Sequence, residues 1–338
     1  MARSARARSP SMKGIVAFAS PRGLRSSVSS GSSPPRRRDV ARHSRGGDAA
    51  GSCRLAGMPI TRLTKPDSKF RLDDVSTDPP RDATKQEAAE RLKELGEELL
   101  ELQELMWGAR THSILIVLQG RDAAGKDGAI KNVVGALNPR GVTVSSFGVP
   151  TKEEREHDFL WRIHRQAPRA GEFAIFNRSH YEDVLVVRVH DLAPKALWGE
   201  RYGHINDFEE LLAEHGTIVI KFFLHISKKE QEKRLLEREE NPSTAWKLNV
   251  NDWKEREHWD EYTEAYDEVF RRCSAKHAPW YIVPADAKWY RNLVVAETVA
   301  ETMREYRDGW LKTLERNGKA GREELDEYRR SRGGRNKG

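Results

Sequence analysis

The feature that most constrains this chain is the stretch LQGRDAAGKDG at residues 118–128. It follows a continuous apolar run, HSILIVL at 112–118, and a helical pattern comes after it. Gly120, Gly125 and Lys126 have the G-x4-G-K spacing of a P-loop, which a strand enters and a helix leaves. Inward-facing backbone N–H groups, the helix N-terminus and the lysine all attract phosphate in such a loop. We therefore predict a phosphate-binding loop here.

Two carboxylates set this loop apart from an ordinary P-loop. Asp127 occupies the position where a P-loop normally offers a Ser or Thr hydroxyl to Mg²⁺, and Asp122 lies within the loop. A phosphate site repels carboxylates unless a divalent cation lies between them. We therefore expect Asp122 to hold Mg²⁺, directly or through water. Asp127 either belongs to this phosphate site or only places a favourable negative charge at a helix N-terminus.

A second segment with the composition of a site is FAIFNRSHYEDVLVVRV at 173–189. Its apolar strand ends at once in polar residues, which places Asn177 and Arg178 at the carboxyl edge of a sheet, where α/β proteins bind ligands. The planar fork of Arg178 fits phosphate oxygens. Glu182 and Asp183 could supply a second carboxylate to a metal. The alternative is a surface turn with ordinary ion pairs.

A third segment, at 233–262, combines basic residues with three tryptophans around a proline. Phosphoryl-transfer enzymes close such a flap over the substrate to exclude water. We predict a lid at about 234–262, with Arg234, Arg238 and Lys247 directed at phosphate. The alternative is a charged helical hairpin exposed to solvent.

Strand and helix patterns alternate along the chain, which predicts an α/β fold with a mostly parallel sheet and helices on both faces. No run of 18 apolar residues occurs, so we expect no membrane partner. The expected strands are 112–118, 141–147, 172–176, 217–226 and 280–285, and the expected helices are 82–110, 126–137, 152–167, 207–216, 228–240 and 289–311.

The positive charge of the chain is concentrated at its N-terminal end. Residues 1–57 hold twelve Lys and Arg against two acidic residues, which leaves −3 on the rest of a chain with a total of +7. We therefore expect no specific nucleic-acid partner and a purely local anion site. The Arg-, Ser- and Gly-rich composition of 1–57 predicts disorder. An organelle transit peptide, a basic tail and an upstream extension ending before Met58 remain open, and we favour the last.

We expect a single catalytic domain at 58–312, followed by the end of a helix and a basic tail at 313–338. Cys53 and Cys273 fit neither a disulfide framework nor a zinc site, and plain thiols suit a reducing compartment. A cytoplasmic protein is therefore expected, with organelle targeting by the first segment left open.

Three segments in this order resemble the polyphosphate kinase 2 family over roughly residues 60–312. GRDAAGKDGAIK is similar to its Walker A form, FNRSHYEDVLVVRV to its Walker B region and PSTAWKLNVNDWKERE to its lid. The resemblance implies a three-layer P-loop kinase fold like that of thymidylate kinase, with a helical lid. It also implies Mg²⁺-dependent transfer of the terminal phosphate of inorganic polyphosphate to a nucleotide, with Mn²⁺ as an alternative ion.

The resemblance assigns roles to particular residues. Asp122 and Asp183 would hold the metal and Lys126 would anchor phosphate, with Arg178 completing the catalytic set. Lys247, together with Arg234 or Arg238, would line the polyphosphate or close the lid. The expected phosphate- and nucleotide-binding set is Gly120, Arg121, Gly125, Lys126, Asp127, Asn177, Arg178 and Glu182.

The stretch SHYEDVL resembles the subgroup that phosphorylates both AMP and ADP. Adenine nucleotides are therefore the expected acceptors, with guanine nucleotides as an alternative, and the reaction is reversible in principle. The resemblance and the long helix at 82–110 suggest a homo-oligomer, either a dimer or a tetramer. An ATP-dependent nucleoside monophosphate kinase is the first rival, although Asp127 in place of Ser or Thr argues against it. A non-catalytic nucleotide- or polyphosphate-binding regulator is the second.

Overall fold

The computed structural model describes residues 50–55, 58–243 and 245–333. Most of the segment predicted to be disordered, residues 1–49 and 56–57, lies outside the described residues. Residues 50–55 depart from that prediction, since they form a strand that pairs antiparallel with the strand beginning at Met58. The second strand lies beside the edge of the parallel sheet, where a further strand satisfies its unpaired backbone groups.

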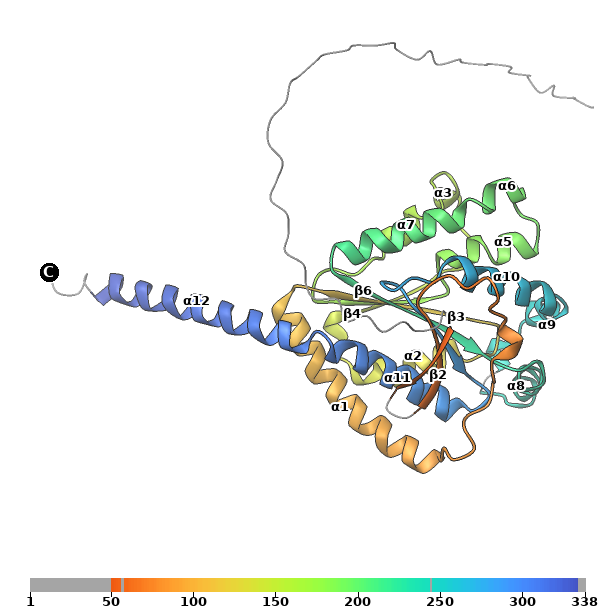
Figure 1. Cartoon of the computed structure of the whole chain (residues 1–338), viewed down its shortest axis with the longest axis horizontal. Helices are drawn as coiled ribbons and strands as arrows, with labels where there is room; N and C mark the ends of the chain where they lie inside the picture. The colour runs from red at the N-terminus through yellow and green to blue at the C-terminus, as the bar shows by residue number, and fades with distance from the viewer. Residues whose placement is uncertain (1–49, 56–57, 244, 334–338) are drawn as a thin grey trace, which may run out of the picture. The chain divides into compact units, whose positions relative to one another are not determined.

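The described residues form a seven-stranded sheet in the order β1-β2-β7-β6-β3-β5-β4 (Figure 1). The five strands from β7 to β4 are parallel, whereas β2 runs antiparallel to β7. Five of the strands confirm predictions, and β1 and β2 were missed. The strands are β1 (Ala50–Leu55), β2 (Met58–Leu63), β3 (Ser113–Gly120), β4 (Val142–Ser146), β5 (Phe173–Asn177), β6 (Thr217–His225) and β7 (Trp280–Pro284).

The central strand β3 is buried along its whole length because helices cover both faces of the sheet. Ile114 and Ile116 join a core with α1 (Lys85–Ala109), α2 (Lys126–Val133) and α11 (Lys288–Arg304). Leu115 and Val117, which point to the opposite face, join a core with α7 (Arg201–Glu214) and α10 (Trp259–Arg272). Figure 1 shows these two helical layers on either side of the sheet, so the predicted three-layer fold is confirmed.

The predicted helix at 152–167 is wrong as one element. It forms two single turns, α3 (Lys152–Arg155) and α4 (Trp161–His164). Between them the Asp158 carboxylate accepts a hydrogen bond from the N–H of Leu160, which is a local alternative to continuing the helix. The remaining short elements are η1 (Leu72–Asp74), η2 (Val134–Ala136), η3 (Pro139–Gly141), η4 (His180–Asp183), α5 (Val186–Val189) and α6 (Lys195–Trp198).

The predicted lid segment is helical. It consists of α8 (Lys228–Glu240), η5 (Ala245–Lys247) and α9 (Val250–Glu257), and α10 follows. In Figure 1, α8 and α9 lie together at one end of the sheet.

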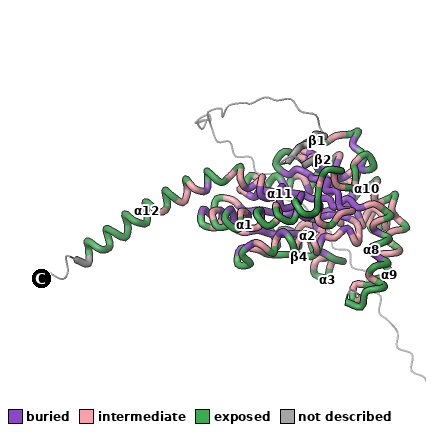
Figure 2. The backbone as a smooth tube through the Cα atoms, turned by 90° about the horizontal axis from the view of Figure 1, so that it is seen from below, coloured by how far each residue is buried: buried purple, intermediate pink, exposed green. Residues whose placement is uncertain are grey.

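The C-terminal region differs from the prediction of a helix end and a tail after residue 312. Helix α11 ends at Arg304, and a second helix, α12 (Arg307–Gly333), continues to the end of the described chain. Its outer part is rich in strong helix formers but lacks a broad apolar stripe, so the hydrophobic pattern did not reveal it. Figure 2 shows that much of α12 is exposed. No helix among the described residues is long and apolar enough to span a membrane.

Candidate active site

The two predicted site segments meet at one edge of the sheet. The P-loop follows β3, and the polar turn that begins at Asn177 follows β5. These strands are parallel neighbours, with Leu118 in register with Asn177. The N–H of Arg178 also donates to the Leu118 carbonyl at 3.1 Å. The structure therefore places the P-loop and the polar turn after β5 at the same edge of the sheet, as predicted.

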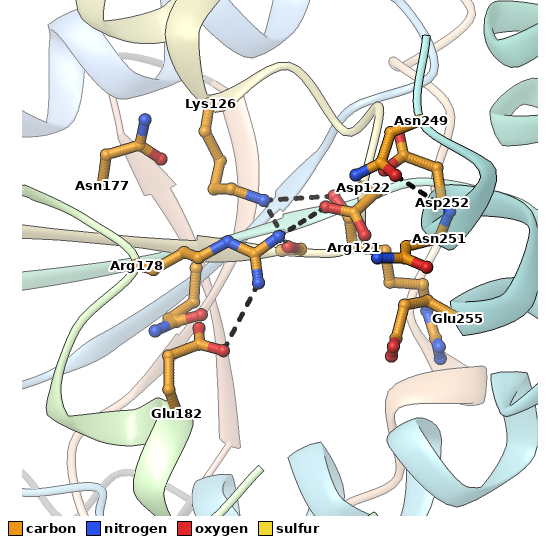
Figure 3. Close-up of polar contacts among 12 residues, drawn as sticks. Arg121, Asp122, Lys126, Asn177, Arg178, Glu182, Asn249, Asn251, Asp252 and Glu255 are labelled. Carbon is orange, nitrogen blue, oxygen red and sulfur yellow. Dashed lines mark hydrogen bonds and ion pairs between the residues drawn. The ribbon is translucent and has the colours of Figure 1, made fainter. Parts of the chain in front are cut away.

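Arg178 lies between two acidic side chains (Figure 3). Its guanidinium donates to Asp122 at 2.7 Å and lies 3.5 Å from Glu182. The residue has a left-handed backbone, with φ of 64°, which costs energy for a side chain other than glycine. Glu182 and Asp122 raise the pKa of Arg178 by electrostatic attraction, although burial opposes them. Burial, in turn, raises the pKa of Glu182 despite the nearby guanidinium.

Lys126 is buried and folded back on the loop. Its ammonium donates to the carbonyls of Gly120 at 2.6 Å and Arg121 at 3.3 Å. Burial lowers its pKa, and the positive charge of Arg178 adds to this effect. The first three N–H groups of α2, those of residues 126–128, have no hydrogen-bond acceptor within the described chain. These free donors form the phosphate cradle that the spacing of the glycines predicts.

Asp127 connects the P-loop helix to two other segments. It accepts hydrogen bonds from Asn177 at 3.0 Å and from Lys247 of the lid at 3.2 Å. Its carboxylate is largely exposed. Although partial burial opposes the shift, the bonds from Lys247 and Asn177 lower its pKa. Lys247 is therefore a residue that joins the lid to the phosphate site.

Asp183 lies in the same cavity as Asp122 but is held by other cations. Arg201 donates to its carboxylate at 3.0 Å, and Arg162 lies 3.8 Å away. Burial nevertheless raises its pKa. No cluster of three or more metal-binding side chains occurs in the part of the chain that is described. Mg²⁺ needs only one or two carboxylates besides phosphate oxygens and water, so one or two of Asp122, Glu182 and Asp183, which line the same cavity, would suit this ion.

Two arginines predicted to contact phosphate have other partners in the structure. Arg121 donates to the carbonyl of Trp259 and to the hydroxyl of Thr263, and its guanidinium stacks 3.7 Å from the Trp259 ring centroid. It therefore ties the P-loop to α10. Arg234 is only 4% exposed and donates to four carbonyls, so its predicted position in the lid facing polyphosphate is wrong. Those four acceptors belong to Ala123, Ala124, Ala285 and Asp286.

Arg238 does belong to the lid, where it pairs with Asp252 at 2.7 Å. Asp252 lines the same cavity as Asp122 of the P-loop. Burial and the negative charge of Asp122 raise the pKa of Asp252. The amides Asn249 and Asn251 also face this side (Figure 3). They were missed because a helix-capping asparagine, such as Asn249 before α9, is common in any protein, and Asn251 is an ordinary polar residue in the first turn of that helix.

A cavity of about 500 Å³ lies between the P-loop, the turn after β5 and the lid. Its size is that of a small-molecule site. Asp122, Arg178, Glu182 and Asp183 form part of its wall. Its apolar and aromatic lining was not predicted, because these residues are scattered in the sequence and look like core: Phe147, Val149, Pro150, Val186, Val187, Leu192, Trp259, Tyr262 and Tyr266.

Within the described chain, a mostly parallel sheet, a P-loop with free N–H donors at residues 126–128, facing carboxylates and a lid whose Lys247 contacts Asp127 define a P-loop phosphotransferase. The model of the family "Polyphosphate kinase 2" matches residues 82–308. The chain therefore belongs to the polyphosphate kinase 2 family.

Curated and solved relatives agree with this assignment. The chain is 50% identical over 244 residues to an AMP/ADP-polyphosphate phosphotransferase of Meiothermus ruber, covering 71% of this chain and 90% of the relative. It is 42% identical over 232 residues to an ADP-polyphosphate phosphotransferase of Rhodopseudomonas palustris, covering 65% and 80%. The crystal structure of polyphosphate kinase 2 from Arthrobacter aurescens TC1 matches with a TM-score of 0.69 at 41% identity, covering 71% and 87%.

Proposed function

We propose that this protein transfers the terminal phosphate of inorganic polyphosphate to ADP and to AMP. The observation that carries the proposal is the cavity that Asp122 of the P-loop lines together with Arg178, Glu182 and Asp183, opposite residues of the lid. Asp122 belongs to the same P-loop whose α2 N–H groups, those of residues 126–128, have no acceptor within the described chain. The Meiothermus relative, named for both acceptors, supports the same two nucleotides. Adenine is the proposed base, and guanine nucleotides are the alternative that a substrate series would test.

In the proposed step, a terminal phosphate oxygen of the nucleotide attacks the end phosphorus of polyphosphate. A new P–O bond forms, the bond to the bridging oxygen breaks, and the chain leaves shortened by one phosphate with the electron pair. The same step in reverse would phosphorylate the chain. Free N–H groups of α2 and the charge of Lys126 hold phosphate oxygens, and Arg178 keeps Asp122 and Glu182 in place. Such positioning and charge neutralisation carry most of phosphoryl-transfer catalysis.

Mg²⁺ is the proposed cofactor, with Mn²⁺ as a substitute. Bound Mg²⁺ would supply positive charge that orients and neutralises phosphate oxygens. Asp122 would hold it, since its carboxylate lies in the loop and lines the cavity. Asp183 and Glu182 are the two candidates for a second carboxylate. Titration of Mn²⁺ into Asp183→Asn and Glu182→Gln, followed by electron paramagnetic resonance, would separate them, because only loss of a ligand weakens the ion's binding.

The apolar wall of the cavity is proposed to receive the nucleotide base. Trp259, Tyr262 and Tyr266 provide aromatic surface that a planar base can cover. Asn249 and Asn251 provide amide donors and acceptors nearby. A lid that carries both the amides and Lys247 would close over base and phosphate together.

Nucleotide chromatography tests the proposed activity. The protein is mixed with Mg²⁺ and polyphosphate, and with either ADP or AMP, beside Asp122→Asn and a control, Glu101→Gln, which changes an exposed carboxylate on α1. ATP from ADP, lost only in Asp122→Asn, supports the proposal, and ADP from AMP supports the second acceptor. Phosphorylation that requires ATP and ignores polyphosphate would instead indicate an ordinary nucleotide kinase. Absence of product with both donors would favour a binding protein.

A homo-oligomer, either a dimer or a tetramer, is also proposed. The leucine stripe of α1 does not support a contact through that helix, because Leu95, Leu99 and Leu102 are buried within the chain. Helix α12 supports one better, since Leu325 and Tyr328 are 46% and 56% exposed one turn apart. Light scattering of Leu325→Lys tests the contact: a smaller particle than the wild type supports it, and an unchanged oligomer argues against α12 as its interface.

A further inference from the structure

Helix α11 carries a charged residue in a nearly apolar setting. Arg291 is 3% exposed, and it lies on a helix whose neighbouring side chains are almost all buried. One of its guanidinium nitrogens donates to the carbonyl of Ala124 in the P-loop at 3.2 Å. The other two donate to the side chain of Asn292 at 2.8 and 3.1 Å. The guanidinium of Arg291 thus lies directly behind the phosphate cradle.

The glycines of the loop leave space for this guanidinium. A Cβ atom on Gly125 would lie 1.9 Å from one nitrogen of Arg291, and a Cβ on Gly128 would lie 2.8 Å from another. Gly125 also needs a left-handed backbone, with φ of 98°, but Gly128 is an ordinary helical position. A strong helix former at position 128 would stabilise α2 more than glycine does. The space that the Arg291 guanidinium occupies therefore explains why this residue is glycine.

Arg291 differs from Arg234, the other arginine behind the loop. Arg234 has an acidic partner, Glu230, at 2.9 Å. Arg291 has no ion pair with any residue that the structure describes, and burial together with the repulsion of Arg234 lowers its pKa to about 10. A buried cation without a counter-charge is costly to the free protein. An anion bound at the N–H groups on the front of the loop would offset that cost.

We propose that Arg291 is a positioning residue whose uncompensated charge and hydrogen bond to the Ala124 carbonyl make the P-loop bind phosphate chains tightly. This inference rests on the proposed function, because the anion whose binding Arg291 would strengthen is the phosphate of the substrate. The charge acts from behind the loop, while the bond to the carbonyl of Ala124 keeps the following N–H groups turned to the front. Neighbouring Ala123 has a left-handed φ of 59°, and Arg234 holds its carbonyl in turn.

Isothermal titration of inorganic tripolyphosphate, with Mg²⁺ present, tests this role. Arg291→Met is expected to raise the Kd at least tenfold and to reduce the rise in melting temperature that tripolyphosphate gives the wild type. Arg291→Lys keeps the charge and is expected to stay within about threefold of the wild type. Arg169→Met, which changes an exposed arginine, is the control and is expected to bind as the wild type does.

A second variant covers the case in which Arg291→Met does not fold. Gly128→Ala improves helix propensity but pushes the guanidinium away from its place, so it is expected to fold and to raise the Kd at least threefold. If folded Arg291→Met binds tripolyphosphate as tightly as the wild type, the inference about Arg291 is overturned and the proposed function is unaffected. If Arg291→Met does not fold, wild-type affinity in Gly128→Ala has the same meaning. If the wild type binds neither tripolyphosphate nor ADP, the proposed function fails along with it.

Discussion

The P-loop and the lid face the same cavity, but different interactions hold them in place. The P-loop is fixed from behind by buried groups: Gln231 and Arg234 from α8, and Arg291 from α11, bind three of its successive carbonyls. The outer part of the lid, η5 and α9, is held by ion pairs that include Lys247–Asp127, Arg238–Asp252 and Arg256–Glu232. The side chains of Lys247 and Asp127, which form one of these ion pairs, are 33% and 69% exposed.

This difference has an energetic meaning. Exposed ion pairs contribute about 0.2–1 kcal/mol each, so the contact of Lys247 with Asp127 costs little to break. Buried hydrogen-bonded arginines are much costlier to remove, because their acceptors lose their partners in a dry environment. The loop therefore serves as a preorganised cradle and the lid as a part that can open for substrate.

The largest expected effect comes from removing the charge of the cradle itself. Lys126→Met should lower kcat by roughly 100- to 1,000-fold, because an electrostatic contact to the transferred phosphate is lost. Lys131→Met, which changes an exposed lysine on the same helix, should leave kcat unchanged. Initial rates of ATP formation from ADP and polyphosphate measure both. An active Lys126→Met would show that the P-loop lysine is not needed.

Arg178→Lys tests the contacts that the guanidinium makes with Asp122 and with Glu182. An ammonium is a point charge and cannot reach Asp122 and Glu182 as the guanidinium fork does. We expect kcat to fall about 10- to 100-fold, with the folded state retained in the circular dichroism spectrum. A rate equal to that of the wild type would mean that the fork is not part of the active geometry.

Disturbing the lid should have a smaller effect, and mainly on KM. Lys247→Met removes the contact with Asp127, so we expect the KM for polyphosphate to rise about 2- to 5-fold, which corresponds to less than about 1 kcal/mol. Lys254→Met changes an exposed lysine of the same lid without such a contact and serves as the control. Steady-state kinetics at two salt concentrations measure the effect, which should shrink as salt screens the pair. A large fall in kcat instead would contradict a weakly held lid.

Glu182 gives the smallest predicted effect, on stability and its pH dependence. Its pKa is raised in the folded protein, so the folded state binds more protons than the unfolded state, and its stability falls as pH rises through this range. Glu182→Gln removes that dependence. Its melting temperature relative to the wild type should therefore be higher at pH 8 than at pH 5, as thermal unfolding at each pH would show. A difference that does not change with pH would mean that Glu182 titrates normally.

The sequence was informative where chemistry and pattern coincide. The apolar run at 112–118 and the glycine spacing predicted the strand and the loop, and polar residues directly after a strand predicted the position of Arg178. The partners of these residues were harder to predict. Arg234 lies in a charged segment that reads as a lid, but helix packing turns its side chain inward onto backbone carbonyls. Such packing depends on the tertiary structure and leaves no local signal.

Arg291 could have been recognised from the sequence, since a single arginine in the apolar stretch YRNLVVA indicates a buried charged residue, and such residues are often functional. The helix α12 and the strands β1 and β2 were missed for a different reason. The outer part of α12 is exposed, so its hydrophobic pattern is weak. In β2 the buried Ile60 and Leu63 are separated by Thr61 and Arg62, and β1 lies in the Arg-, Ser- and Gly-rich segment, so neither strand shows a clear apolar run.

Hydrogen exchange measured by mass spectrometry tests the contrast between loop and lid most directly. Peptides from β3 and from η5–α9 are compared in the free protein and with ADP, Mg²⁺ and tripolyphosphate. We predict that β3 exchanges slowly in both states, whereas residues 245–257 exchange quickly in the free protein and slow at least tenfold when the ligands bind. Equal protection of the lid in both states would contradict a lid that is held weakly and closes over substrate.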